Sequence, residues 1–494
     1  LGELLQRLRR VATIRRLQTV GLGPRDGPRC VEIVHGNKGD YASTINPEMD
    51  FAPRGLLSAA RWSGDISLLE SSAPSRELSI RGLSIRGLSI PGSSSDCRES
   101  LADNLLITLT RIFPVMDHQW EPTSWQSKPV AQQPTYDDPS ELDAALENLA
   151  GLPPLVTSWE VERLKGKLAR AAQGHGFLLQ GGDCSEESDD CTSPTIVRKL
   201  KVLLQMSLVL VYGSKQQVIR VGRIGGQYAK PRSADQETRD GVSLPSYRGD
   251  LVNRVPFTAE ARRPDPQRLL RGYERAALTL NLIRALSVGG FADLHHPENW
   301  DLEFVRNTPG SRRYQQLLDS LSDSIRFMEA VSVGELTQLT RVDFFTSHEA
   351  LLLPFEQALT RMERQRGWYN LGTHMAWIGD RTRAIDGAHM EYFRGIRNPI
   401  GVKIGNTMAP DELLDVIRIL NPENEPGRLT LIHRFGAEKI RTQLPTLVEA
   451  VLRSGSNVLW SCDPMHGNTQ TARSGVKTRS FDDVMSEIIT AFRI

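Results

Sequence analysis

The sequence lacks the long apolar segments and the charge imbalance that define several classes of protein. No uninterrupted apolar run reaches the roughly 18 residues that a membrane-spanning helix needs, so we expect no membrane insertion. Across the 494 residues, 60 Lys and Arg stand against 59 Asp and Glu, which gives a net charge of +1. Electrostatic binding of nucleic acid needs a marked basic excess, so we expect no nucleic-acid partner.

Cysteine is also scarce. The five cysteines, which show no short regular spacing, are Cys30, Cys97, Cys184, Cys191 and Cys462. Small secreted proteins that depend on disulfides carry a denser and usually even set. The sequence therefore predicts no disulfide framework and favours a reducing compartment.

Three common nucleotide-binding and catalytic motifs are absent. The sequence has no GxGxxG that opens a helix after a strand, no GxxxxGK[ST] and no GxSxG. These absences argue against a Rossmann dinucleotide site, a P-loop and a serine nucleophile elbow. Apolar residues make up 39% of the chain and charged residues 24%, which is typical of a globular protein with a sizeable core.

Residues 1–116 differ from the rest, and we interpret them as an irregular N-terminal extension. Within residues 1–17, leucine and valine recur at helical spacing with arginines between them. This pattern indicates either an organelle-targeting or membrane-surface helix or, as we favour, an N-terminal docking helix. Residues 78–92 repeat LSIRG, LSIRG and LSIPG. A five-residue period suits neither a helix nor a strand, so we predict a flexible linker there.

From about residue 117, short apolar runs alternate with helical patterns. The predicted strands are 177–180, 218–221, 343–345, 374–378, 400–404, 429–432 and 458–460, and the predicted helices include 142–149, 160–172, 409–420, 438–453 and 482–492. Alternating strands and helices indicate a parallel sheet. The sequence thus predicts a TIM-type (β/α)8 barrel domain over residues 117–494, with about seven of its eight strands present.

Cationic side chains follow several of these strands. They are Arg223, Lys230, Arg232, Arg381, Lys403 and Arg434. A cation near a buried strand end is unfavourable unless an anion meets it, so the set indicates either a phosphorylated ligand or pairing with Asp and Glu inside the barrel. Cys184 follows the first strand and His466 follows the last. This pair suits a divalent transition metal, although a free thiol and a hydrogen-bonded histidine are the commoner interpretation.

Several longer segments resemble one family. They are GFLLQGGDCSE (176–186), VGRIGGQYAKPRS (221–233), HMAWIGDRTRAIDGAHMEYFRGIRNPIGVKIG (374–405), LNPENEPGRLTLIHRFGAEKI (420–440) and DPMHGNT (463–469). In this order, across about residues 117–494, they resemble the type II, plant-like 3-deoxy-D-arabino-heptulosonate 7-phosphate synthases. The resemblance implies a (β/α)8 barrel that condenses phosphoenolpyruvate with erythrose 4-phosphate, the first step of the shikimate pathway and of aromatic amino acid biosynthesis.

The resemblance also implies roles for individual residues. Cys184 and His466 match the metal ligands. The remaining matches are Arg223, Arg381, Lys403 and Arg434 as phosphoenolpyruvate-binding cations, Trp377, Gly379 and Asp380 as pocket residues, and Lys230 and Arg232 on the sugar-phosphate side. We expect Lys403 and Arg223 to be catalytic, with Lys403 or a water on the metal as the proton carrier. The expected metal is Mn²⁺, with Co²⁺ or Zn²⁺ as alternatives, in a cytoplasmic or plastid homo-oligomer.

The sequence departs from the family pattern at four places. One is VTSWE (156–160), which replaces a small-residue segment. Asp380 stands where the family usually has Glu. The acidic run Glu186, Glu187, Asp189 and Asp190 replaces an aromatic-containing segment, and we interpret it as a solvated loop. The sequence ends at Ile494, before a Gly-Gly-Val-His-Leu-Glu strand and a Cys-Asp-Pro segment that give the family's metal a glutamate and an aspartate. An alternative is therefore a truncated, catalytically impaired paralogue that binds phosphometabolites or a full-length subunit.

Overall fold

A computed structural model describes residues 78–80, 83–85, 120–289, 291, 311–331, 342–364, 366–473 and 477–494. The chain divides into two compact units, residues 1–119 and 120–494, and each is described by itself. The helix predicted over residues 1–17 lies outside the described residues. Within the described parts, no helix is both long and apolar enough to cross a lipid bilayer.

Two copies of the repeat in the first unit form strands. β1 (Leu78–Ile80) pairs antiparallel with β2 (Leu83–Ile85), with Leu78 opposite Ile85. The expectation that a five-residue period suits no strand is wrong for these two copies of the repeat, whereas the flexible-linker interpretation of the extension stays a prediction. A five-residue period leaves room for a three-residue strand in each copy, as β1 and β2 show.

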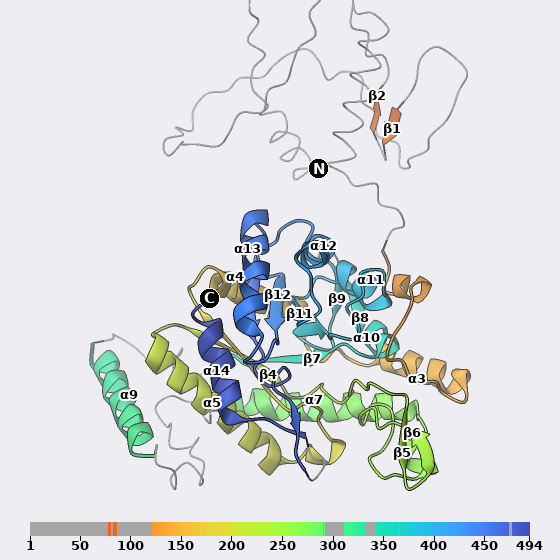
Figure 1. Cartoon of the computed structure of the whole chain (residues 1–494), viewed down its shortest axis with the longest axis horizontal. Coiled ribbons are helices and arrows are strands. Elements are labelled where there is room, and N and C mark those ends of the chain that lie inside the picture. The colour runs from red at the N-terminus through yellow and green to blue at the C-terminus, as the bar shows by residue number, and fades with distance from the viewer. Residues whose placement is uncertain are drawn as a thin grey trace, which may run out of the picture. The chain divides into compact units, whose positions relative to one another are not determined.

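The second unit is built on a seven-stranded parallel sheet (Figure 1). Its strands are β3 (Phe177–Gly182), β4 (Val218–Arg223), β7 (Phe345–Glu349), β10 (Met375–Ile378), β11 (Ile400–Ile404), β12 (Leu429–His433) and β13 (Leu459–Cys462). Their spatial order is β13-β12-β11-β10-β7-β4-β3, so neighbours along the sheet follow the order of the chain. All seven predicted strands and the predicted α/β barrel type are confirmed, as a nearly closed sheet with helices around it.

One strand lies further along the chain than predicted. The sequence places a strand at residues 343–345 followed by a polar tip, but β7 runs from Phe345 to Glu349. Its polar side chains are buried because they have internal partners. The Thr346 N–H donates to His374 Nδ1 over 2.9 Å, and its hydroxyl donates to the Ile224 carbonyl over 2.7 Å.

Helices cover the outside of the sheet (Figure 1). They include α5 (Ser193–Ser214), α7 (Gln267–Val288), α11 (Ala388–Gly395), α12 (Pro410–Leu420), α13 (Ile440–Ser454) and α14 (Phe481–Ala491). Further elements are α3 (Pro139–Gly151), α6 (Ala259–Arg262), α9 (Ser311–Val331), α10 (Leu353–Ala358), and the hairpins β5–β6 (Gln236–Arg239, Val242–Pro245), β8–β9 (Thr360–Glu363, Gly367–Asn370) and β14–β15 (Gln470–Thr471, Lys477–Thr478). The five predicted helices are confirmed to within a few residues.

The largest core cluster lies between the sheet and helices α11–α13. Ile400 and Val402 of β11 and Leu431 of β12 are fully buried against Phe393 and Leu413 of these helices. α12 forms readily here because Pro410 opens it and Asp411 and Glu412 occupy its first turn, where carboxylates favour the helix dipole. This packing fixes the strands whose ends carry most of the candidate site.

Helix α4 (Ser158–Ala172) closes the sheet at the starts of its strands. Leu164 and Leu168 pack with residues at the beginnings of four strands, namely Ile219, Phe345, Met375 and Leu459. A capping box begins the helix: the Glu160 N–H donates to the Thr157 hydroxyl, and the Glu160 carboxylate accepts from the Thr157 N–H. The opposite, carboxyl ends of the strands are therefore the accessible ends.

Strands β3 and β13 are the two end strands of the sheet, and α14 spans the interval between them. Phe492, which follows α14, stacks on Phe177 of β3 with ring centroids 6.1 Å apart. At the other side, Glu487 of α14 accepts hydrogen bonds from the backbone after β12. Within the residues that the structure describes, no eighth strand pairs with β3 or β13.

Candidate active site

A cavity of about 210 Å³ opens at the carboxyl ends of the strands. Five of the predicted site residues line it: Cys184, Arg223, Trp377, Lys403 and His466. They come from the ends of β3, β4, β10 and β11 and from the segment after β13. Because parallel strands all end at the same side of a barrel, residues far apart in sequence meet here. The remaining lining residues include Gln180, Gly182, Ile432, Cys462, Asp463, Met465 and Arg479.

The two predicted metal ligands face each other. Cys184 Sγ lies 3.4 Å from His466 Nε2. The hydrogen bond from His466 lowers the pKa of the Cys184 thiol to about 7, although partial burial opposes this change. The hydrogen bond with Asp463, followed by that with Cys184, raises the pKa of His466.

Asp463 connects this pair to Lys403. Its Oδ2 accepts a hydrogen bond from His466 Nδ1 over 2.7 Å and one from Lys403 Nζ over 2.5 Å. Burial opposes ionisation of Asp463, but Lys403 and His466 still hold its pKa well below the usual range. Burial lowers the pKa of Lys403 while Asp463 opposes that shift. Asp463 thus orients both groups, a role that we did not predict from sequence.

The lowered pKa of Cys184 predicts that its thiol reacts with alkylating agents at neutral pH. In metal-free protein, alkylation of Cys184 by iodoacetamide should have its pH midpoint near 7, because only the thiolate reacts. Mass spectrometry of the Cys184 peptide across a pH series measures this rate. The His466→Ala variant should shift the midpoint upward. The same midpoint in both proteins would show that His466 does not activate the thiol.

Arg223 lies at the end of β4, directly over the indole of Trp377. Its guanidinium carbon is 4.7 Å from the ring centroid, and its Nη2 donates to the Cys184 carbonyl over 3.0 Å. Its Nε is buried and has no hydrogen-bond partner among the described residues. A buried N–H without an acceptor costs free energy unless a ligand supplies one, so this donor favours an anionic ligand in the cavity.

Arg434, just after β12, borders the same region. Its Nη2 donates to the His466 carbonyl over 2.9 Å and its Nη1 lies 3.3 Å from Asp380 Oδ2. Its Nε is also buried without a partner in the described part of the chain. The Asp380 carboxylate lies between two guanidinium groups, because Oδ1 accepts from Arg383 over 3.3 Å.

The other predicted cations lie beside the cavity and do not line it. Arg381 donates from Nη2 to the Ser233 hydroxyl over 2.9 Å, which joins the end of β10 to the segment that follows β4. Lys230 Nζ lies 5.7 Å from the centroid of the Tyr247 ring. Arg232 pairs with Glu237 of the β5–β6 hairpin over 3.6 Å. Lys230 and Arg232 therefore lie outside the cavity lining, on the segment whose Ser233 accepts the hydrogen bond from Arg381.

Glu349, at the end of β7, is a carboxylate that the sequence reasoning missed. Burial raises its pKa, while Arg223, Lys403 and Arg381 oppose the shift. A Cβ at position 379 would overlap the Glu349 carboxylate, so Gly379 is needed there to make room. Its place in the polar run 346–349, which follows the strand predicted at 343–345, is the signal that could have identified it.

The interpretation of the acidic run as a solvated loop is wrong for Glu186. This residue is 3% exposed, and its carboxylate accepts from the N–H groups of Gly225, Gly226 and Gln227 over 2.7–2.9 Å. Gln227 in turn accepts from the Glu349 N–H through its side-chain oxygen. Glu186 therefore fixes the segment after Arg223, whereas Glu187 and Asp189 are exposed as expected.

Replacement of Glu186 by glutamine should lower the free energy of unfolding by about 1–3 kcal/mol. The amide keeps one acceptor oxygen but turns an NH₂ group toward backbone donors, which leaves at least one buried N–H without a partner. Chemical denaturation measures the change, and exposed Glu187→Gln is the matched control. Equal stability of the two variants would contradict the assigned contacts.

Arg479 is a further cation of the cavity that we did not single out from sequence. It follows β15, lines the cavity, and donates from Nε to the Met465 carbonyl over 3.0 Å. It contributes to lowering the pKa of the Cys184 thiol. Arg479 therefore adds positive charge on the side of the cavity that Cys184 and His466 form.

The geometry of Cys184 and His466 fits a shared metal ion. Two ligands at about 2.3 Å (S) and about 2.1 Å (N) from a tetrahedral ion lie roughly 3.6 Å apart, close to the 3.4 Å between Sγ and Nε2. The His466 Nδ1 contact with Asp463 leaves Nε2 as the ligand atom, as in many carboxylate–histidine–metal arrangements. The donor set suits a divalent transition metal.

Comparison with known proteins identifies the family of the chain. Residues 120–494 match the Class-II DAHP synthetase family. A Streptomyces coelicolor protein is 50% identical over 372 residues, which cover 75% of this chain and 82% of that protein. A Neurospora crassa protein is 46% identical (76% and 81% covered), and a Mycolicibacterium smegmatis protein is 44% identical (74% and 80% covered). All three bear the name phospho-2-dehydro-3-deoxyheptonate aldolase. The chain therefore belongs to the Class-II DAHP synthetase family.

Proposed function

We propose that residues 120–494 condense phosphoenolpyruvate with erythrose 4-phosphate and water to give 3-deoxy-D-arabino-heptulosonate 7-phosphate and phosphate. Membership of the family supports this reaction, which is the first step of the shikimate pathway. The cation-lined cavity supports our proposal for where the substrates bind. Carbon 3 of the enol phosphate attacks the aldehyde carbon, water adds at carbon 2, and phosphate leaves with cleavage of the C–O bond.

Arg223, Lys403 and Arg434 are proposed to hold phosphoenolpyruvate. Arg223 and Arg434 each present a buried Nε that has no acceptor among the described residues, and Lys403 lies between their strands. A bidentate guanidinium contact fits phosphate and carboxylate oxygens, while an ammonium group acts as a point charge. Trp377 provides a flat wall, and Arg381 with Ser233 points to the side where Lys230 and Arg232 would receive the sugar phosphate.

Lys403 is proposed as the proton carrier at Nζ. Its burial lowers the pKa of the ammonium group, which favours release of a proton. Asp463 holds the group in place through the hydrogen bond to Oδ2. Lys403 can therefore take the proton that the attacking water loses and remain fixed beside the reacting carbons.

Cys184 and His466 are proposed to hold the divalent metal, for which Mn²⁺ is our first choice and Co²⁺ or Zn²⁺ the alternatives. Bound there, the metal would act as a Lewis acid on the aldehyde oxygen of erythrose 4-phosphate. The contacts among Asp463, His466 and Arg434 keep the ligand pair in place before any substrate arrives.

We also propose that the protein is cytoplasmic and that it forms a homo-oligomer. The enzyme names of the relatives do not favour the alternative of an impaired paralogue.

The proposed function is tested by incubating the full chain with both substrates and Mn²⁺. We expect phosphoenolpyruvate to disappear only when erythrose 4-phosphate is present, and mass spectrometry to detect the seven-carbon phosphate. A chelator should stop the reaction and added Mn²⁺ should restore it. Phosphoenolpyruvate binding without turnover would contradict the proposal.

Within the same assay, Arg479→Gln should raise the KM for phosphoenolpyruvate by about 3–10-fold. Loss of one partly solvated charge contact typically costs about 0.5–1.5 kcal/mol. Exposed Arg473, on the same hairpin segment, provides the control variant Arg473→Gln. An unchanged KM in Arg479→Gln would remove Arg479 from the binding site.

A further inference from the structure

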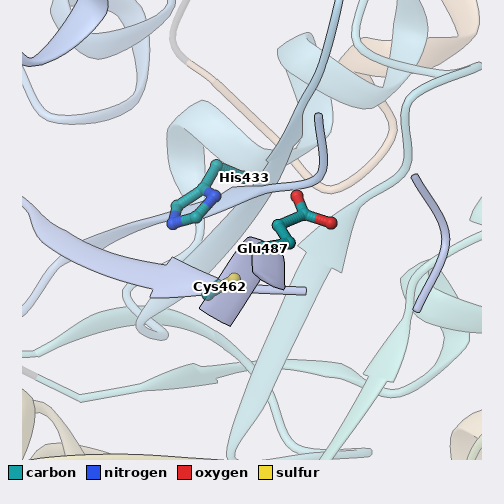
Figure 2. A group of neighbouring side chains, drawn as sticks. All are labelled: His433, Cys462 and Glu487. Carbon is teal, nitrogen blue, oxygen red and sulfur yellow. The ribbon is translucent and has the colours of Figure 1, made fainter. Parts of the chain in front are cut away.

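A second group of ligand-type side chains lies behind the wall of the active-site cavity. Figure 2 shows His433, Cys462 and Glu487 together, and one ligand atom from each lies within 4.8 Å of the others. His433 and Cys462 are register partners at the ends of neighbouring strands β12 and β13. Glu487 comes from α14, which packs over them.

This group is separate from the Cys184–His466 pair. Ile432 and Ser461, one residue earlier in each strand, line the active-site cavity. Side chains alternate between the two faces of a strand, so His433 and Cys462 project to the other face, toward α14. Cys462 is nevertheless also one of the residues that line the cavity, so the two sites adjoin at this strand end.

His433 presents a nitrogen that lacks a partner. Its side chain is 3% exposed, and Nδ1 has no hydrogen bond to any described residue. A buried nitrogen in this state is unfavourable unless a donor or a metal meets it.

Glu487 is held in position by surrounding donors. Its Oε1 accepts from the N–H groups of Phe435 and Gly436 over 2.9 and 3.0 Å, and its Oε2 accepts from Asn468 Nδ2 over 2.7 Å. These contacts leave a lone pair on Oε2, because a carboxylate oxygen has two. Outer contacts of this kind orient a metal ligand and reduce the ordering that binding requires.

We propose that His433, Cys462 and Glu487 form a second metal site for Zn²⁺ or a similar borderline-soft divalent ion. Nitrogen, thiolate and carboxylate ligands are those that Zn²⁺ takes. As the S–Zn bond forms, the Cys462 thiol releases its proton to solvent, so the thiolate and carboxylate charges neutralise the ion. The bound metal ties α14 to the ends of β12 and β13, next to Arg434 and Asp463. This inference does not depend on the proposed reaction.

The test uses the full chain, stripped with chelator, reloaded with Zn²⁺ or Co²⁺ and desalted. Cys462→Ser should hold one metal equivalent fewer than the wild type by elemental mass spectrometry. The control Cys191→Ser, whose half-buried thiol contacts Thr279, should match the wild type. Cys184→Ser, which lacks the active-site thiolate, should retain a thiolate-to-Co²⁺ charge-transfer band, and Cys184→Ser/Cys462→Ser should lose it.

A second variant separates metal loss from misfolding. His433→Asn removes the imidazole while the Glu487 contacts remain, so it should lose the same metal equivalent and keep the wild-type circular dichroism spectrum. Zn²⁺ should raise the Tm of the wild type and of Cys191→Ser more than that of His433→Asn. Equal metal content in wild type, Cys462→Ser and His433→Asn would overturn the second site.

Discussion

Replacement of Cys184 by serine is expected to weaken binding of Mn²⁺ by more than about 100-fold, a larger loss than the 10–100-fold typical of outer-shell partners. The thiol lies 3.4 Å from His466 Nε2, and this hydrogen bond lowers the pKa of Cys184 to about 7. A serine hydroxyl stays protonated at that pH, so the site would lose its anionic sulfur ligand. Isothermal titration with Mn²⁺ measures the affinity directly.

The same substitution should leave the fold nearly unchanged. Cys184 is exposed, so little packing is lost with its sulfur. Urea denaturation of metal-free Cys184→Ser should therefore give a free energy of unfolding within about 0.5 kcal/mol of the wild type. Cys191→Ser serves as the thiol control and should titrate like the wild type. If Cys184→Ser binds Mn²⁺ with unaltered affinity, the assignment of this ligand is wrong.

Replacement of Arg434 by alanine is expected to raise the Kd for phosphoenolpyruvate by about 10–150-fold, which corresponds to the roughly 1.5–3 kcal/mol of a hydrogen bond to a charged group. The Nε of Arg434 is buried and has no acceptor among the described residues. Its Nη2 donates to the carbonyl of His466, the proposed metal ligand, so the guanidinium group lies next to the metal site. Its loss removes a donor and a charge from the phosphoenolpyruvate side.

The affinity is best measured by the intrinsic tryptophan fluorescence of the protein, to which Trp377 in the cavity contributes, on titration with phosphoenolpyruvate in the absence of the second substrate. Arg453→Ala, on the exposed face of α13, is the matched control because it removes an arginine without touching the cavity. Arg434→Lys should give an intermediate Kd, since it keeps the charge but not the bidentate geometry. Wild-type affinity in Arg434→Ala would place the substrate elsewhere.

The strands of the sheet were predictable from sequence because each is a short apolar run that ends in polar residues. The exception is β7, whose polar residues look like a loop but are buried through bonds such as that from Thr346 to His374. Helix α5 was missed because exposed Val202, Met206 and Val209 obscure its amphipathic pattern. Hydrophobic periodicity predicts which residues are buried only where apolar side chains are buried and polar side chains are exposed.

Arg223 and Lys403 were predictable from the sequence as parts of the candidate site, because a cationic side chain at a buried strand end is unfavourable unless an anion meets it. The residues that connect these groups were not. Asp463 bonds His466 and Lys403, and Glu186 binds three backbone N–H groups 39–41 residues away in sequence. Such partners become visible only when the chain is folded, because their role depends on contacts that no local pattern encodes.

The most direct test of the active-site assignment follows the bridging oxygen of phosphoenolpyruvate. The full chain is incubated with Mn²⁺, erythrose 4-phosphate and phosphoenolpyruvate that carries ¹⁸O between carbon 2 and phosphorus. We expect the released phosphate to retain the ¹⁸O in the wild type, with turnover strongly reduced in Cys184→Ser and Arg434→Ala. Unlabelled phosphate, or equal turnover in the two variants and the wild type, would contradict condensation at this cavity.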